Sequence, residues 1–328
     1  MQYGEIDFQE IFNFTQKHGL VGPVTVGLEH VSDTKIPHKH VLNFVGSALQ
    51  LEQRNKAMNR FISKLIETLR MKDIYCLLVK GQGLSQCYTK PLWRYCCDID
   101  LFFSDSGYSK AVSFLSSLAS EIVQDSRYTK SYGVIIDNWQ VELHGTLRSG
   151  LSSRIDHIID DVQRDVFYGG DVRTWMDGNT QIFLPGVNSD IFLLFTHFVR
   201  HFYHNEFLIR QTCDWCRFIW TYQDLIDINK LERRLKSIHM IDEWRSFAAF
   251  VVKYLGMPEE SMPLYENSYR WDRKADQILS IVIRDRKPNK LFDTFLISRI
   301  FLFNTLHFLP SLLLNINGLK IKERLLGA

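Results

Sequence analysis

The sequence predicts an α+β protein in which a mixed β-sheet with helices is followed by an α-helical domain. Three observations predict this. Residues 74–79 form a continuous apolar run, residues 132–136 and 139–144 alternate between apolar and polar side chains, and helical periodicity runs from residue 188 nearly to the C-terminus. The first two patterns are typical of a buried and a half-buried strand, and the third of packed helices.

Helices are expected over residues 5–20 and 41–71, with a loop punctuated by Gly22-Pro23 and Pro37 between them. The run at 74–79 should be a central strand, because it is apolar throughout. The later expected elements are a helix from 83 to 88, a strand through 98–103, a helix over 106–118, a strand from 121, a hairpin of 132–136 and 139–144 turning at Asp137-Asn138, and strands at 171–175 and 180–185.

This pattern divides the chain into three parts. Residues 1–72 are an N-terminal helical segment that packs on the core, and residues 73–187 are an α/β domain. Residues 188–328 are a helical domain, broken at Gly256-Met257-Pro258 and at two further prolines.

The composition, 45% hydrophobic and 23% charged, is that of an ordinary globular protein. The 39 basic and 37 acidic residues nearly balance, so the net charge gives no reason to expect bulk attraction to nucleic acid. The polar start of the chain is unlike a signal peptide, so a cytoplasmic location is expected. Cys213 and Cys216 have the spacing of a redox or zinc pair, but no second pair completes four ligands, which favours buried thiols.

The most apolar stretch, residues 300–315, is shorter than the ~20 residues needed to cross a bilayer. We interpret it as a packed core helix. The alternative is a helix lying on a membrane surface, with the basic residues Lys320, Lys322 and Arg324 just beyond it.

Acidic residues on two predicted strands indicate the chemistry. Asp98 and Asp100 are two apart and therefore share one strand face, and Glu142 shares a face with His144. Carboxylates that face the same way repel each other unless a cation lies between them, and hard oxygen ligands suit Mg²⁺ or Mn²⁺. If the strands are neighbours, the three carboxylates can hold two metal ions roughly 3.5–4 Å apart, which is the arrangement for in-line phosphoryl transfer from a nucleoside triphosphate.

The motifs Lys80-Gly81, Asp98-Ile99-Asp100-Leu101 and Glu142-Leu143-His144, with the spacer from Tyr88 to Arg94, resemble the nucleotidyltransferase superfamily of polymerase beta. More narrowly, they are similar to the bacterial group called uncharacterised nucleotidyltransferase, over about residues 60 to 220. The resemblance implies a nucleotidyltransferase-type sheet in 73–187, with a helical part that closes over the nucleotide. Active members usually carry Gly-Ser at the phosphate-binding turn, whereas this chain has Lys80-Gly81-Gln82-Gly83.

The resemblance also assigns roles to the cationic and glycine residues. Lys80 can replace the hydroxyl contact with a full charge, and Gly81 and Gly83 let the backbone approach phosphate oxygens. Arg94 is a second phosphate contact, by its bidentate guanidinium. Their alternatives are a surface lysine and a salt-bridged structural arginine.

Three histidines are candidates for supporting roles. His144 can orient Glu142 or contact substrate, or it is a hydrogen-bonded structural residue. His197 and His201 lie four apart on one helix face, and the resemblance places them toward the cleft with Asp214 fixing one imidazole. A polar packing role is the alternative for both.

We therefore expect Mg²⁺- or Mn²⁺-dependent transfer of a nucleotidyl group from a nucleoside triphosphate to a hydroxyl, phosphate or amine acceptor on a small molecule, sugar or protein. Asp98 and Asp100 would hold the metal that bridges the triphosphate and would share a second one with Glu142, which is alternatively a general base. Two other functions stay open. One is a catalytically inactive nucleotide-binding or regulatory protein, and the other is a membrane-surface protein.

Overall fold

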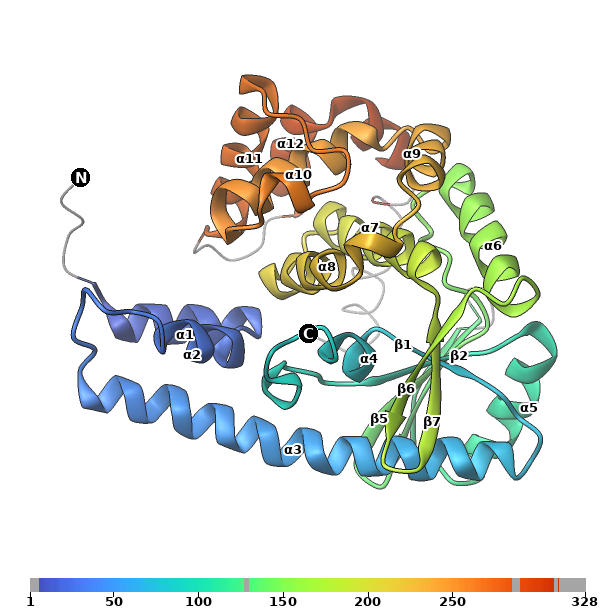
Figure 1. Cartoon of the computed structure of the whole chain (residues 1–328). Helices are drawn as coiled ribbons and strands as arrows, with labels where there is room; N and C mark the ends of the chain where they lie inside the picture. Colours follow the sequence, from blue (N-terminus) through green and yellow to red (C-terminus); the bar gives the residue numbers. More distant parts are fainter. Residues whose placement is uncertain (1–5, 127–129, 285–289, 310–311, 313–328) are drawn as a thin grey trace, which may run out of the picture. The chain divides into compact units, whose positions relative to one another are not determined.

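The computed structural model describes residues 6–126, 130–284, 290–309 and 312. The chain divides into two compact units, which Figure 1 shows in sequence colours. The first comprises residues 1–146 and 172–185, and the second comprises residues 147–171 and 186–328. The predicted boundaries at residues 72 and 187 stay predictions.

Five strands of the first unit form one sheet in the order β1-β2-β5-β4-β3, and β6 and β7 form a separate hairpin. The β2–β5 pair is parallel, whereas the other pairs are antiparallel. The predicted mixed sheet with helices is therefore confirmed. The elements of this unit are α1 (Phe8–His18), α2 (Val21–Leu28), α3 (His38–Arg70), β1 (Leu77–Val79), α4 (Gly81–Ser85), the 3-10 turn η1 (Pro91–Trp93), β2 (Ile99–Phe102), α5 (Asp105–Ser116), β3 (Glu121–Ser126), β4 (Ser131–Ile136), β5 (Trp139–His144), β6 (Val172–Asp177) and β7 (Thr180–Pro185).

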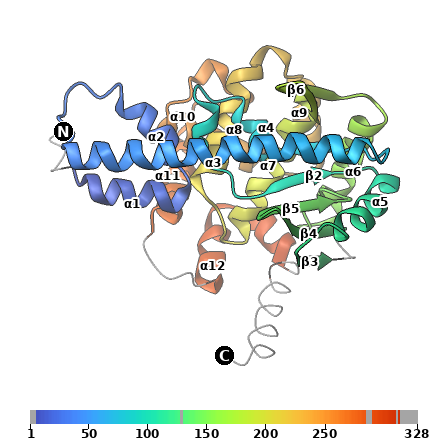
Figure 2. The same ribbon diagram turned by 90° about the horizontal axis from the view of Figure 1, so that it is seen from below.

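The N-terminal helices differ from expectation at one place. Gly22 and Pro23, predicted to punctuate a loop, lie in the first turn of α2. Proline is tolerated there because the first amides of a helix have no partner within the helix. The long helix α3 matches its prediction closely, and α1 and α2 lie along its first half (Figure 2).

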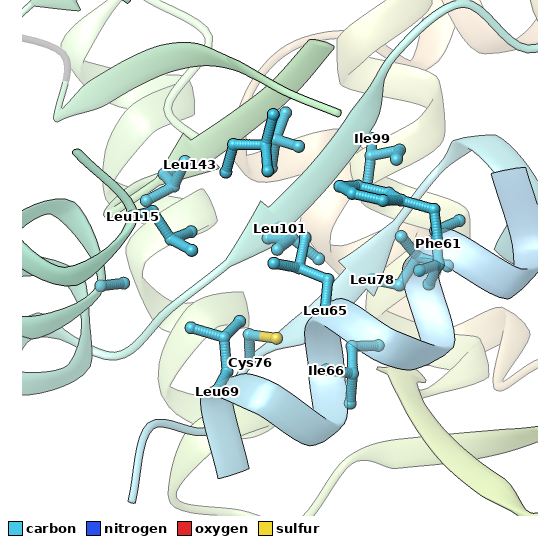
Figure 3. Packing of buried hydrophobic residues seen from close by; sticks show 14 of the residues in the cluster. Phe61, Leu65, Ile66, Leu69, Cys76, Leu78, Ile99, Leu101, Leu115 and Leu143 are labelled. Carbon is cyan, nitrogen blue, oxygen red and sulfur yellow. The ribbon is translucent and has the colours of Figure 1, made fainter. Parts of the chain in front are cut away.

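The apolar core of this unit lies on one face of the sheet. Alternate residues of β2 and β5 point into it, and the second half of α3 covers it together with α5 (Figure 3). Its central members include Phe61, Leu65, Leu69, Leu78, Ile99, Leu101, Leu115 and Leu143. Because strand side chains alternate, the polar residues of β2 and β5 project from the opposite face.

The hairpin between β4 and β5 turns as the sequence predicts. Asp137 and Asn138 both have positive φ, 49° and 66°. This is the conformation of a two-residue turn whose twist matches that of the flanking strands, and Asp and Asn tolerate it. The turn fixes the register of β5 and hence the face from which Glu142 projects.

The second unit is helical within the described residues and is built around aromatic side chains. Trp215 and Trp244, for example, pack edge to face with ring centroids 4.7 Å apart, and Gly256 ends α10 at φ 72° as expected. The helix α6 is not among the elements expected from the sequence. The elements are α6 (Ser153–Phe167), α7 (Val187–Tyr203), α8 (Ile209–Tyr222), η2 (Gln223–Leu225), α9 (Ile228–Ser237), α10 (Ile241–Leu255), η3 (Glu259–Ser261), α11 (Tyr269–Val282) and α12 (Lys290–Ile300).

Among the described residues, no helix has both the length and the apolar character that a membrane span requires. The basic residues Lys320, Lys322 and Arg324, which prompted the membrane-surface alternative, lie outside the described residues.

A carboxyl group is buried inside the second unit. Glu243 is 1% exposed, and its Oε1 accepts hydrogen bonds from Tyr203 Oη (2.7 Å) and Asn304 Nδ2 (2.6 Å). Burial raises the pKa of Glu243, although these hydrogen bonds and the charge of Lys274 act in the opposite direction. Arg154 also interacts electrostatically with Glu243. The folded state therefore favours the protonated carboxyl more than the unfolded chain does.

This imbalance predicts how stability depends on pH. A group whose pKa is raised on folding stabilises fully below its unfolded pKa, and that contribution is lost as the pH rises through the folded value. We expect wild-type stability to fall, relative to Glu243→Gln, as the pH rises above the ordinary pKa of a glutamate side chain. Urea unfolding of both proteins at several pH values measures the difference. A difference that is independent of pH would contradict the prediction.

Candidate functional site

The parallel pairing of β2 and β5 brings two carboxylates together. Asp100 lies directly opposite Glu142 in the register, so both side chains project from the same face of the sheet. His144, two residues further along β5, shares that face. One ligand atom from each of Asp100, Glu142 and His144 lies within 4.8 Å of the others. The three form a group that can hold a metal ion.

Asp100 is the buried centre of this group, at 4% exposure. Its Oδ1 lies 2.7 Å from His144 Nε2 and 3.4 Å from Lys80 Nζ. Burial alone would raise the pKa of Asp100, but the charge of Lys80 and the hydrogen bond to His144 outweigh it and hold the pKa well below its usual range. Asp100 is therefore an anion, and His144 donates to it through Nε2–H.

Glu142 is half-buried and less well compensated. Its Oε1 accepts a hydrogen bond from Gln140 Nε2 at 2.8 Å, and its Oε2 lies 3.8 Å from His144 Nε2. Burial raises the pKa of Glu142, and the negative charges of Asp100 and Asp98 raise it further. A cation placed between these carboxylates would relieve that repulsion, and their oxygen atoms suit a hard divalent ion.

Asp98 lies immediately before β2, outside its ladder. Its Oδ1 accepts a hydrogen bond from Cys97 Sγ at 3.3 Å, and its charge acts on Glu142. Among the described residues, the group of possible metal ligands contains His144 and not Asp98. The metal role of Asp98 stays a prediction. The sequence indicated that His144 belongs to the site, because it shares a strand face with Glu142.

The turn after β1 holds Lys80 in an unusual backbone conformation, φ 57° and ψ −140°. Such angles are costly for a side chain other than glycine, and they persist only where the surroundings impose them. Here they accompany the approach of Lys80 Nζ to Asp100. Gly81, at φ 41°, follows in the same turn. The turn therefore places a fixed cation beside the carboxylates.

Gly83 has a packing reason to be glycine. A Cβ atom at this position would lie 2.7 Å from Leu184 Cδ2, so a side chain here would require the buried Leu184 side chain of β7 to shift. Gly81 is also buried, and a Cβ there would lie 3.2 Å from Cys96 Sγ. The phosphate-binding role of both glycines stays a prediction.

A family model described as uncharacterised nucleotidyltransferase matches residues 4–256 of the chain. The chain belongs to this family. The matched region includes the Lys80-Gly81 turn and every carboxylate of the site, and the match confirms the resemblance to the uncharacterised nucleotidyltransferase family.

The structural comparison finds an antigenic nucleotidyltransferase-like protein from Paracoccidioides brasiliensis. It is 12% identical, with a TM-score of 0.36, and the similarity covers 64% of this chain and 94% of that one. No curated protein matches the sequence.

Arg94 is the second cation predicted to bind phosphate. It is buried, at 2% exposure. Its carbonyl oxygen accepts a hydrogen bond from Asn55 Nδ2 at 2.8 Å. Asn55, which the sequence analysis did not single out, lies on the buried stripe of α3 that continues to Met58 and Ile62. A polar residue on an apolar helix face was the signal that could have identified it.

The remaining predicted residues belong to the second unit. The rings of His197 and His201 are 4.5 Å apart, and His201 Nδ1 lies 3.5 Å from Glu206 Oε2. Asp214 is buried on α8, with Arg210 Nη1 3.8 Å from its Oδ2. The substrate-facing role of these residues stays a prediction.

The cysteines of α8 are free thiols. Burial raises the pKa of Cys213 to about 12 and the pKa of Cys216 well above its ordinary value. Metal binding and redox chemistry require a thiolate, so both groups are suited to packing.

Proposed function

We propose that the protein is a metal-dependent nucleotidyltransferase that transfers a nucleoside monophosphate from a nucleoside triphosphate to an acceptor. The observation that carries the proposal is the meeting of Asp100, Glu142 and His144 within 4.8 Å, beside Lys80. Family membership supports the same reaction class.

In the reaction we propose, an acceptor oxygen or nitrogen attacks the α-phosphorus as the bond to the pyrophosphate oxygen breaks, and the acceptor loses its proton. Asp100 and Glu142, with Asp98, would hold Mg²⁺ or Mn²⁺. When bound, such ions neutralise triphosphate charge and lower the pKa of an acceptor hydroxyl. Glu142 projects from the same face of the sheet as Asp100, so it could instead accept the proton of the acceptor. This is the second role that the sequence leaves open for Glu142.

The other residues position the substrate. Lys80 and Arg94 would bind phosphate oxygens, the first as a point charge and the second as a bidentate donor. His144 holds Asp100 through its hydrogen bond and is itself a possible ligand. Most of the rate enhancement would come from fixed charges placed where negative charge develops.

The test is label transfer. The protein is incubated with each α-labelled nucleoside triphosphate and a panel of hydroxyl, phosphate and amine acceptors, with Mg²⁺ or Mn²⁺ and with EDTA. We expect pyrophosphate release and labelled product that depend on the metal. Triphosphate binding without turnover on any acceptor would instead support the non-catalytic, regulatory function, and the absence of both would contradict the proposal.

A further inference from the structure

The long helix α3 reaches the predicted phosphate-binding residues through one buried amide. Asn55 is fully buried. Its Nδ2 donates to Leu92 O and to Arg94 O, each at 2.8 Å, and its Oδ1 accepts from Gln82 Nε2 at 2.9 Å. A single side chain therefore joins two segments that are separate in the sequence, the short helix α4 that follows Lys80 and the 3-10 turn η1 with Arg94 at its end.

The Asn55 amide thereby gives hydrogen-bonding partners to buried polar groups of both segments. Gln82 extends the connection, because its Oε1 accepts from Ser85 Oγ at 3.1 Å. Arg54, the neighbouring residue of α3, donates to the carbonyl oxygens of Cys96 and Cys97, just before Asp98.

The chemistry of the contact requires asparagine. Two carbonyl oxygens need two donors on one atom, while the Gln82 amide needs an acceptor, and only a primary amide offers both in so short a side chain. Aspartate would place oxygen against two carbonyls, and glutamine is one methylene too long. The second half of α3 packs in the sheet core, which fixes the helix and hence the amide.

We propose that Asn55 is a positioning residue that sets the cations Lys80 and Arg94 for the triphosphate, without contacting the substrate. This inference rests on the proposed function for its ligand. It assigns Asn55 to the phosphate side of the site and not to the carboxylates that would hold the metal. Asn55 therefore affects triphosphate binding much more than binding of the metal alone, because Asp100 and Glu142 are held by the pairing of β2 with β5.

The test compares Asn55→Ala with Asn59→Ala in the full-length chain. Asn59 is a matched control because it lies one turn further along α3, is also buried, and its Oδ1 has no hydrogen-bond partner among the described residues. We expect Asn55→Ala to weaken triphosphate affinity about tenfold or more, with Mn²⁺ present, while Mn²⁺ affinity measured without nucleotide changes less than about threefold. Asn59→Ala should change neither.

A double-mutant cycle with Lys80→Ala tests the route of the effect. If Asn55 acts through the Lys80 turn, the losses in triphosphate affinity are not additive. Additive losses, or equal losses of Mn²⁺ and triphosphate affinity, would overturn the proposal.

Hydrogen exchange separates this proposal from the proposed function. Asn55→Ala should speed amide exchange in residues 80–86 and 91–95, relative to wild type and to Asn59→Ala. If the wild type binds no triphosphate, the function fails, and faster exchange still supports the positioning of the two segments by Asn55. Unchanged exchange would contradict the positioning role whatever the function.

Discussion

Replacing Asp100 by asparagine is expected to abolish nucleotidyl transfer while the protein stays folded. The substitution keeps the size of the side chain but removes its negative charge. In the wild type, this carboxylate interacts with His144 and Lys80 and would hold the metal. Metal-based stabilisation of the transition state amounts to several kcal/mol, so turnover should fall ~10³-fold or more. Steady-state rates of label transfer measure the loss, and thermal unfolding verifies the fold.

Asp105→Asn is the matched control for this experiment. Asp105 begins α5, shortly after the same strand, but its side chain is 78% exposed and pairs with Lys130. Exposed ion pairs contribute little, so turnover and stability should stay near the wild-type values. If Asp100→Asn retained a tenth of the wild-type rate, Asp100 would not be at the reaction centre.

Strand alternation accounts for how much of the site could be predicted. Alternation places Ile99 and Leu101 on the strand face opposite to Asp100. In the structure, Ile99 and Leu101 lie in the core. The hairpin signal at Asp137-Asn138 then placed Glu142 on a strand. Both are local properties of the backbone, and they hold because one face of the sheet must be buried.

The partners of these carboxylates depend on tertiary structure. The sequence does not show that β2 and β5 pair in parallel with Asp100 opposite Glu142, because strand order depends on packing of the whole sheet. The contact of Lys80 with Asp100 follows from the antiparallel pairing of β1 with β2, which sets Val79 opposite Asp100, together with a strained turn. The role of Asn55 could not be predicted for the same reason, since its three partners lie in α4 and around η1, far along the chain from α3.

Local signals were also misleading where two effects competed. Gly22-Pro23 is a loop signal, yet both residues lie in α2. A proline in the first helical turn loses no helix hydrogen bond, and the glycine serves a close contact with η1 that a propensity scale does not contain.

Gly22→Ala should strongly destabilise the first unit. A Cβ atom at residue 22 would lie 1.8 Å from the carbonyl oxygen of Trp93 and 2.7 Å from its carbonyl carbon. These are backbone atoms, which cannot rotate away, so α2 or the segment around Trp93 must move. Overpacking of this kind costs roughly 3 kcal/mol. Thermal or urea unfolding measures the loss, and triphosphate affinity should fall with it, because Arg94 follows Trp93 directly.

Gly27→Ala tests whether the effect comes from the contact or from the helix. Gly27 lies on the same helix, and a Cβ atom there would have nothing within 4 Å. Alanine favours the helix over glycine, so this variant should be stabilised by about 0.5–1 kcal/mol. The two substitutions add the same methyl group to the same helix, and opposite signs of the stability change would therefore identify the approach to Trp93 as the cause. If both variants were equally stable, α2 would not pack against this segment as closely as the structure places it.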